Sequence, residues 1–545
     1  MSRDVAGAEA TAGTDVRKRT VRLRGNPLLT LVVVGLGVAM VGLDATIVVI
    51  ANPYIASSLH CSFSDLQWVV NAYLLTLAVL LIPMGKVGDR FGRRLMFLLG
   101  VAGFAACSFA IGKVGSIGGV IAFRALLGVF GAMLMPSTLA IVRSAFPKEK
   151  LNKAVGIWGG AAAVSVAAGP VVAGLLVQHA SWEWCFFVNV PVGLVTLGLG
   201  MALLAESRDW HHARRFDYRG LVLVASGLFC VVFGLVKADT WGWGDPKTIA
   251  FLAGGVILLV LFGLAEVHTD VPLVPMRLFR DWRITFGTLV VMAIFFSLFG
   301  VLFFVTLYLL NVHGYGPVAA GVRVLPLSAT FMVACPFGGW LNDKCGPRVA
   351  IPAGMLLVSI GLASLAWLEP TSTYVHIWVP FVVLGLGIGP VIVAASDAIV
   401  ASAPVADAGI AGGLQSTALQ VGGVLGTSVL GSVLSTRVGG TLVAKLVDNG
   451  VPTPIAGKLG QAQQLVAQGV APQITGAPAM LQRAVDAGSQ AAFMSGFHVA
   501  VVVAASVSFA AIFLGFLVRG QDDDIDAELD ELVTTMPTDE PVHTS

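Results

Sequence analysis

Charged residues are scarce in this chain of 545 residues. Asp, Glu, Lys and Arg make up 12% of the sequence, hydrophobic residues make up 56%, and the mean hydropathy is +0.86. A soluble protein has about 25% charged residues, so a soluble fold of this size would lack the charges to cover its surface. The 33 basic and 31 acidic residues nearly balance, so the chain has no large net charge that would attract an acidic partner such as nucleic acid. We therefore predict a protein embedded in a lipid bilayer.

The sequence also lacks the common motifs of metal, cofactor and catalytic sites. Its six cysteines form no CxxC pair and no Cys/His cluster, so we expect no disulfide framework and no metal site. It contains no GxxxxGK[ST] nucleotide loop, no HExxH motif and no nucleophile elbow with suitable partners. These absences favour a protein without a cofactor, without a nucleotide partner and without enzyme activity.

Long apolar runs take the place of the missing features. A helix that spans a bilayer needs about 20 mostly apolar residues, and fourteen runs satisfy this length. We therefore expect an all-α membrane protein. The predicted spans are residues 28–51, 66–86, 95–113, 117–142, 154–178, 185–205, 219–237, 248–267, 284–311, 318–341, 349–368, 376–401, 407–436 and 491–518.

The distribution of Lys and Arg predicts the orientation of these spans. If the N-terminus lies inside the cell, inner segments hold 24 of these residues and outer segments hold 7. This imbalance agrees with the positive-inside rule and would be lost if one span were missed. Both termini are predicted to be cytoplasmic, with a polar outer loop at 437–490 and an acidic tail at 519–545.

Two short loops indicate an internal repeat. GKVGDRFGRR (residues 85–94) and GWLNDKCGPR (residues 339–348) share the pattern GxxxDxxGxR, and eight spans separate them. The shared positions are Gly85, Asp89, Gly92 and Arg94 in the first loop, and Gly339, Asp343, Gly346 and Arg348 in the second. A shift of eight among fourteen spans predicts two six-helix halves with two helices inserted between them. The expected divisions are an N-terminal tail 1–27, a first bundle 28–205, a linker with the inserted helices 206–283, a second bundle 284–518 and the tail 519–545.

Asp44 and Arg124 are the strongest candidates for chemistry. A charge inside the apolar zone costs about 2.5–3.5 kcal/mol on insertion scales, so acids there usually mark a pathway or a proton relay. Asp44 is expected in the outer half of the first span, and Arg124 at a similar depth in the fourth. A pair of the two would neutralise both charges and could release and rebind a proton. The alternatives are an acid satisfied by nearby hydroxyl groups and a pair with a structural role alone.

Three further groups of residues suggest moving parts and a binding cavity. Asp89, within a basic loop that also contains Arg90, Arg93 and Arg94, could act as a conformational latch; the alternative is a basic anchor at the membrane surface. Pro170 lacks a backbone donor and, with Gly169 and Gly174, could form a hinge or only a tight helix contact. The aromatic residues Trp158, Phe295, Phe299 and Trp378 could line an apolar cavity, or pack against lipid and neighbouring helices.

These motifs together resemble those of the major facilitator superfamily. GKVGDRFGRR resembles its motif A, Arg124 with Gly128, Gly131 and Ala132 resembles motif B, and Gly169, Pro170 and Gly174 resemble motif C, the antiporter signature. LDATIV (residues 43–48) and WEWCFFVNVP (residues 182–191) resemble segments of its fourteen-helix drug:proton antiporters. The sequence departs from the family at Val49 and Asn52, close to Asp44. It also has no second acid deep in the C-terminal half.

The resemblance implies a major facilitator fold and a proton-coupled exporter of hydrophobic or amphipathic small molecules in a bacterial cytoplasmic membrane. It also implies that the motif B arginine takes part in proton coupling. The expected partners are the small-molecule substrate, protons and lipid, with a monomer as the working unit. Two alternatives remain: a symporter of the same fold that takes up a metabolite, and a membrane-embedded enzyme or sensor.

Overall fold

The structure is a computed structural model that describes residues 24–207, 217–270, 272–403, 408–474 and 476–518. In these residues, fourteen helices are long and apolar enough to cross a membrane, and no segment forms a β-strand. The prediction of an all-α, fourteen-span membrane protein is confirmed. The predicted acidic tail 519–545 and most of the N-terminal tail 1–27 lie outside the described residues.

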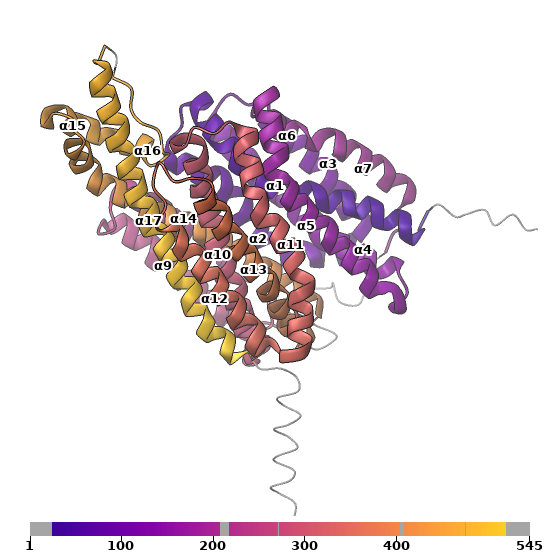
Figure 1. The fold of residues 1–545 in the computed structure, drawn as a ribbon. Helices are drawn as coiled ribbons and strands as arrows, with labels where there is room; N and C mark the ends of the chain where they lie inside the picture. The colour runs from indigo at the N-terminus through magenta and orange to yellow at the C-terminus, as the bar shows by residue number, and fades with distance from the viewer. Residues whose placement is uncertain (1–23, 208–216, 271, 404–407, 475, 519–545) are drawn as a thin grey trace, which may run out of the picture.

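Two six-helix bundles form the body of the molecule, and a helical hairpin lies between them in the sequence (Figure 1). The first bundle contains α1 (Pro27–Leu59), α2 (Phe63–Phe91), α3 (Arg93–Ile111), α4 (Ile117–Ala145), α5 (Lys148–His179) and α7 (Asn189–Leu203), with a short α6 (Trp184–Phe187). The hairpin consists of α8 (Tyr218–Trp241) and α9 (Pro246–Val267). After a 3₁₀ turn η1 (Met276–Arg280), the second bundle contains α10 (Trp282–Leu307) with its π-helical end η2 (Tyr308–Val312), α11 (Pro317–Cys345), α12 (Pro347–Leu365), α13 (Val375–Ala401), α14 (Ala408–Asp448) and α17 (Ala479–Leu517).

Consecutive spanning helices run in opposite directions, so the molecule has two distinct ends. We name them after the ends of α1: the Pro27 end and the Leu59 end. Because the number of spans is even, α17 finishes at the Pro27 end, where α1 begins. The short helices α15 (Thr453–Leu459) and α16 (Gln463–Val466), with the 3₁₀ turn η3 (Gly460–Ala462) between them, lie at the Leu59 end (Figure 1).

The predicted outer loop 437–490 is helical over much of its length. Helix α14 continues to Asp448, and α17 already begins at Ala479. These extensions contain charged and polar residues such as Arg437 and Lys445, which hid them from a search for apolar runs. They are also rich in Ala and Leu, which favour helix, so the helices continue beyond the apolar zone.

The two repeated loops occupy equivalent junctions. Gly92, with a φ of 121°, separates α2 from α3, and Gly346, with a φ of 71°, separates α11 from α12. A positive φ is strained for residues with a side chain but not for glycine, so each loop can turn within a single residue between two helices. The equivalent positions support the internal repeat found in the sequence.

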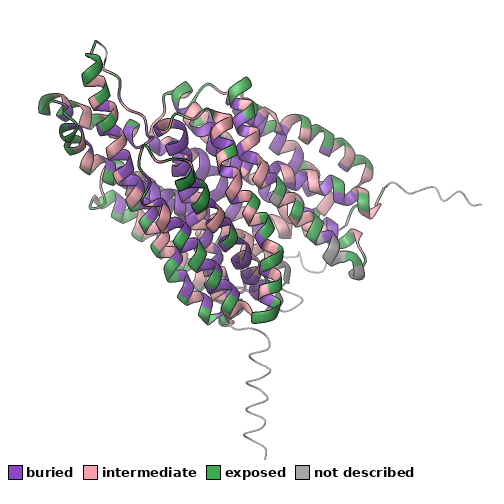
Figure 2. Ribbon diagram, viewed as in Figure 1, coloured by how far each residue is buried: buried purple, intermediate pink, exposed green. Residues whose placement is uncertain are grey.

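Residues are buried where helices meet and exposed on the outward faces of the bundles (Figure 2). The exposed residues include many large apolar side chains. On α9, for example, Val256, Ile257 and Val260 are each more than half exposed. Large apolar side chains on an outward face are expected in lipid, which is as apolar as they are. Packing between the helices relies instead on small residues that allow close backbone approach.

Gly426 of α14 shows how close this approach is. A Cβ at Gly426 would collide with the backbone of Phe296 on α10, whereas a Cβ at Gly412 of the same helix would meet no atom within 4 Å. Gly426→Ala should therefore force α14 away from α10 and lower the melting temperature of the purified protein. Gly412→Ala is the matched control and should keep or raise it, because alanine is the better helix former by roughly 1 kcal/mol. Equal melting temperatures for the two variants would contradict this packing.

Candidate functional site

The two sequence-predicted charges meet inside the first bundle. Arg124 Nη1 of α4 donates to Asp44 Oδ2 of α1 at 2.5 Å. Both side chains are buried, with 1% and 0% of their surface exposed. Such burial is costly for either charge alone, so the two side chains depend on each other.

The arginine is held by groups other than the carboxylate. Its Nε donates to the backbone carbonyl of Val69 at 2.9 Å, and its guanidinium lies over the ring of Tyr73, 4.3 Å from the centroid. Gly128 makes this contact possible, because a Cβ there would collide with the carbonyl of Tyr73. The glycine of the motif B pattern thus brings α4 close enough to α2 for Arg124 to reach its acceptor.

Asp44 has a second partner that the sequence reasoning did not single out. Asn189 of α7 reaches Asp44 Oδ1 at 3.5 Å and Ser108 Oγ at 3.3 Å through its Nδ2 atom. Four helices of one bundle, α1, α3, α4 and α7, therefore contribute side chains to this polar cluster. A buried amide within an apolar run was the available signal for Asn189.

Asp44 lies nearer the middle of its helix than predicted. Helix α1 continues to Leu59 instead of ending near residue 51, so about 22 Å of helix follow Asp44 at 1.5 Å per residue. The helix continues through Pro53, which is tolerated there. The predicted meeting with Arg124 is nevertheless present.

Pro170 frees an acceptor beside this cluster. Proline has no N–H, so the carbonyl of Val166, four residues earlier on α5, lacks its usual helical donor. Thr46 Oγ1 of α1 donates to this carbonyl at 3.1 Å. Gly169 leaves the space, because a Cβ there would collide with Thr46. The motif C residues therefore bind α5 to α1 two residues from Asp44.

The same stretch of α5 contacts the second bundle at the Leu59 end. A Cβ at Gly174 would lie 2.5 Å from the carbonyl oxygen of Pro317, and a Cβ at Gly321 would collide with the carbonyl of Pro170. Toward the Pro27 end, Gly156, Gly159 and Gly160 of α5 have no atom within 4 Å of a Cβ position, and α5 and α11 diverge (Figure 1). The bundles are thus tightly joined at the Leu59 end.

A buried polar seam joins the bundles along α2 and α14. Gln67 Nε2 donates to the carbonyl of Thr427 at 2.9 Å, and Asn71 Nδ2 donates to Ser428 Oγ at 2.9 Å. Thr427 Oγ1 donates in turn to Asn71 Oδ1 at 2.5 Å. When the bundles move, each of these hydrogen bonds can be replaced by a hydrogen bond to another partner. A purely apolar contact is less selective about the surface that replaces it.

The motif A residues Asp89, Arg90 and Arg94 make their contacts close to the first bundle, whereas Lys86 of the same loop donates to the backbone carbonyl of Pro272, after the inserted hairpin. Asp89 pairs with Arg93 at 2.7 Å, and Arg90 lies 5.3 Å from the centroid of the Phe91 ring. Arg94 Nη2 donates to the carbonyl of Met201 at 2.7 Å, and the Glu206 carboxylate accepts from the Arg94 amide at 3.1 Å. A Cβ at Gly92 would collide with that carboxylate.

The second loop is arranged differently. Asn342 Nδ2, beside the repeated acid Asp343, donates to Asp397 of α13 at 3.0 Å, and Asp343 itself is exposed. Arg348 is the second residue of α12, which begins at Pro347 after Gly346. Gly339 lies 3.9 Å from Val393 of α13, measured from its Cβ position. The contacts of Asn342 and Gly339 therefore lie within the second bundle.

The four aromatic candidates lie on three different helices, α5, α10 and α13. Trp158 Nε1 donates to Thr138 Oγ1 at 3.0 Å, Phe295 and Phe299 lie together on α10 with ring centroids 5.9 Å apart, and Trp378 is 39% exposed near the start of α13. Phe299 lies at the meeting of the bundles, since it and Leu74 of α2 both approach the Cβ position of Gly423.

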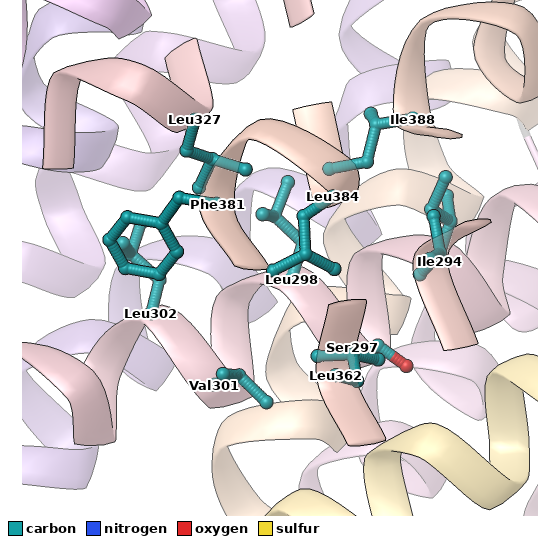
Figure 3. Close-up of a pocket in the computed structure, with 11 residues that line it drawn as sticks. Ile294, Ser297, Leu298, Val301, Leu302, Leu327, Leu362, Phe381, Leu384 and Ile388 are labelled. Atoms are coloured by element: carbon teal, nitrogen blue, oxygen red, sulfur yellow. The ribbon is translucent and has the colours of Figure 1, made fainter. Parts of the chain in front are cut away.

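A separate apolar pocket lies within the second bundle, among α10, α11, α12 and α13. Figure 3 shows its side chains converging, with the Ser297 hydroxyl as the single oxygen among those drawn. That hydroxyl lies 2.8 Å from Ser508 Oγ of α17. The cavity volume is about 10 Å³, the lower limit for a single water. In this conformation the pocket is too small for a drug molecule. Its lining is Ile294, Ser297, Leu298, Val301, Leu302, Leu327, Val358, Leu362, Phe381, Leu384 and Ile388.

Arg323 forms an aromatic cluster at the Leu59 end of the second bundle. Its guanidinium lies 3.9 Å from the ring centroid of Tyr315 and 5.2 Å from that of Tyr374. His313 stacks on Tyr315, with ring centroids 5.1 Å apart. Burial and the Arg323 charge lower the pKa of His313, which favours its neutral form. Arg323 therefore has aromatic partners instead of an acid like that of Arg124.

Comparison with known proteins decides the family. The sequence profile described as Major Facilitator Superfamily matches residues 34–427. The chain belongs to the major facilitator superfamily. Its six-plus-six architecture agrees with two solved superfamily folds. The inward-facing, unoccupied structure of a bacterial homologue of the human lysosomal transporter Spinster has a TM-score of 0.56 at 16% identity, covering 90% of this chain and 98% of that one. A mutant of the nucleoside transporter NupG has a TM-score of 0.57 at 11% identity, covering 90% of this chain and 99% of that one.

Superfamily relatives that are closer in sequence are resistance and efflux proteins. The chain is 44% identical to the tetracenomycin C resistance and export protein of Streptomyces glaucescens, over 92% of this chain and 93% of the relative. It is 36% identical to the puromycin resistance protein pur8 of Streptomyces alboniger, over 77% and 83%. It is 32% identical to the multidrug efflux pump LfrA of Mycolicibacterium smegmatis, over 94% and 98%. The prediction of a drug-efflux transporter of the major facilitator superfamily is confirmed.

The buried ion pair of this transporter yields a stability prediction. Removing one partner of a buried pair leaves an uncompensated charge and costs about 3–5 kcal/mol. Asp44→Ala should therefore lower the melting temperature of the purified protein strongly. Asp44→Asn should lower it less, because the amide oxygen can still accept from Arg124. The double variant Asp44→Ala/Arg124→Met should recover part of the loss, and a double variant no more stable than Asp44→Ala would contradict the coupling.

Proposed function

We propose that this chain exports hydrophobic or amphipathic small molecules across a bacterial cytoplasmic membrane in exchange for protons. The observation that carries the proposal is the buried pair between Asp44 and Arg124. An exchanger needs one group that holds either a proton or another positive partner, and a carboxylate beside a guanidinium has this property.

The proton would move on and off Asp44 as follows. In the paired geometry Asp44 accepts from Arg124 and carries no proton. When Asp44 takes a proton its charge disappears, and Arg124 keeps the Val69 carbonyl and the Tyr73 ring as partners. Asn189 can stay beside Asp44 in both the ionised and the protonated form, because its amide also donates to Ser108 Oγ. The cluster therefore tolerates both protonation states without leaving Arg124 unsolvated.

The protonation state would be linked to the gate through α1 and α5. Thr46, two residues after Asp44, bonds the carbonyl that Pro170 leaves free, and the Pro170 carbonyl in turn lies against Gly321 of the second bundle. A shift of α1 on proton binding would thus act directly on the closed Leu59 end. In the paired, closed geometry the transporter would receive its substrate from the Pro27 end.

The motif A loop would act as a latch in the opposite state. Asp89 and Arg93 pair with each other, within one bundle, while the Leu59 end is closed. When the Pro27 ends of the bundles approach each other, the same side chains become available to the second bundle. Asp343 and Arg348 of the second loop lie at the same end of the molecule.

The resistance relatives support the substrate class, and the apolar lining of the small pocket agrees with it. The pocket of Figure 3 is lined by aliphatic and aromatic side chains, which select for apolar surface without a specific polar partner. Tetracenomycin C, puromycin and methyl viologen appear in the names of resistance relatives and form a suitable test panel. The two bundles complete the transport path within one chain, so we propose a monomer as the working unit.

Efflux measured in everted membrane vesicles tests the proposal. In vesicles energised by respiration, the wild type should accumulate a compound from the panel, and dissipating the pH gradient should stop it. Asp44→Asn cannot release a proton and should reduce this proton-driven accumulation to the level of vesicles without the protein. Rates are divided by the amount of protein in the membrane, because the substitution also affects stability.

Asp245→Asn is the matched control, because Asp245 is an acid that caps α9 and asparagine caps a helix equally well. It should transport like the wild type. Proton-driven accumulation that persists in Asp44→Asn would overturn the assignment of Asp44. Accumulation of a panel compound by intact cells would instead favour uptake by symport.

We further propose that both termini and the whole Pro27 end face the cytoplasm, as the 24-to-7 distribution of Lys and Arg indicates. Cys345 is exposed at the Pro27 end of α11 and serves as a natural reporter. In a variant that keeps only this cysteine, a membrane-impermeant thiol reagent should label Cys345 in everted vesicles but not in intact cells. Gly457→Cys, exposed on α15 at the Leu59 end, should show the reverse. Labelling of Cys345 in intact cells would contradict the orientation.

A further inference from the structure

Two acidic residues lie close together at the Pro27 end of the inserted hairpin, where α8 begins and α9 ends. Asp217 caps the start of α8, and its Oδ1 accepts from the Gly220 amide at 2.9 Å. Glu266 lies at the end of α9, and its Oε2 accepts from the Val274 amide at 3.0 Å. Both residues are buried, at 8% and 2% exposed, and one oxygen of each carboxyl group lies within 3 Å of the same point, the Cβ position of Gly220.

The remaining oxygen of each carboxyl group has no other donor. Asp217 Oδ2 and Glu266 Oε1 are both buried without a donor from elsewhere in the described chain, and both lie within 3 Å of the Cβ position of Gly220. An ionised carboxylate can only accept hydrogen bonds. Two ionised oxygens held this close together repel each other, whereas a proton on one of them allows a hydrogen bond between them.

Lys86 supplies the compensating charge for one carboxylate. It lies on α2 in the motif A loop, and its Nζ donates to the backbone carbonyl of Pro272 at 2.5 Å, next to the stretch of chain that Glu266 holds. Among the described residues, Asp217 and Lys86 are the charged groups that act on Glu266. With one shared proton, the two carboxyl groups carry a single negative charge, which Lys86 balances.

A metal ion is a poorer occupant of this site. No third His, Cys, Asp or Glu side chain joins the two acids within the described part of the chain. Divalent cations bound by carboxylates require several oxygen ligands, and the Lys86 ammonium already supplies positive charge nearby. A proton needs only the two oxygens that are present.

We propose that Asp217 and Glu266 form a second proton-binding site, in which one shared proton holds the hairpin closed and Lys86 ties it to the motif A loop. The site is separate from Asp44, because it lies at the Pro27 end and involves the inserted helices instead of the first bundle's polar cluster. Its ligand is a proton from the aqueous phase at that end.

The hairpin packs against the boundary between the two bundles, so this site could affect transport. Helix α8 packs against both α2 and α14, the two helices of the polar seam between the bundles. Trp68 of α2 lies against Phe229 of α8, and Trp243 Nε1 donates to Thr436 Oγ1 of α14 at 3.2 Å. Loss of the shared proton would loosen the hairpin at the Pro27 end and release the seam that it covers.

Two measurements on the purified full chain test the site without relying on transport. Infrared spectra should contain a carbonyl-stretch band of a buried protonated carboxylic acid that disappears in Glu266→Gln. Hydrogen–deuterium exchange, corrected for the intrinsic pH dependence of amide exchange, should show residues 217–222 and 264–270 losing protection from neutral to alkaline pH. Glu266→Gln, which mimics the protonated acid, should keep these segments protected across the range.

Lys86→Gln should shift the pH of the alkaline transition in a known direction. A nearby positive charge favours loss of the shared proton, so its removal should move the alkaline transition to higher pH. A merely structural role of Lys86 would loosen the segment at every pH and leave the transition where it is. Asp245→Asn, an acid at the other end of the same hairpin, is the control and should keep the wild-type transition.

The proposal is overturned if Glu266→Gln retains both the acid band and the alkaline transition of the wild type. It is also overturned if the transition depends on added divalent cations instead of pH. Because neither measurement involves substrate or Asp44, failure here leaves the export proposal intact, and failure of Asp44→Asn to affect efflux leaves this site intact.

Discussion

One ion pair between helices α1 and α4 constrains the rest of the first bundle. A carboxylate or a guanidinium alone in a lipid-shielded interior is expensive, and the pair of Asp44 and Arg124 is tolerated because each compensates the other. The surroundings follow from this requirement. Gly128 brings α4 to α2 so that Val69 and Tyr73 can complete the environment of Arg124.

Close backbone contact then connects this charged cluster to the boundary between the bundles. Pro170 leaves the Val166 carbonyl without a helical donor, and Thr46 donates a hydrogen bond to it. Where α5 meets α11, glycines allow the two backbones to touch. Packing of this kind has few intermediate positions, because a close contact between backbones is either made or lost. A small movement of α1 can therefore be converted into opening or closing of the Leu59 end.

The sequence predicted most of the fold because lipid imposes simple rules on it. Apolar length located all fourteen spans, and the repeated loops at Gly92 and Gly346 located the two halves. Helix ends were less accurate, since α14 and α17 continue into polar sequence where hydropathy carries no signal. There, helix propensity and packing decide the structure.

Site residues could be predicted from the sequence where a charged residue lies within an apolar run. They could not be predicted where the role of a residue depends on the neighbours that the fold gives it. Asp44 and Arg124 stand out by composition alone. Asn189 is an ordinary amide until the fold places it beside Asp44. Asp217 and Glu266 are 49 positions apart in the sequence, and only the fold brings both carboxyl groups to Gly220. The aromatic candidates show the converse: Trp158 and Trp378 are conspicuous in the sequence, but neither is among the residues that line the pocket of Figure 3.

The central claim is that substrate and proton are alternatives governed by Asp44. The most direct measurement is the proton released into weakly buffered solution when a transported compound binds to the purified protein. We expect release of about one proton per bound molecule at a pH where Asp44 is protonated before binding, and none from Asp44→Asn at the same occupancy. Equal release from the wild type and Asp44→Asn would contradict it.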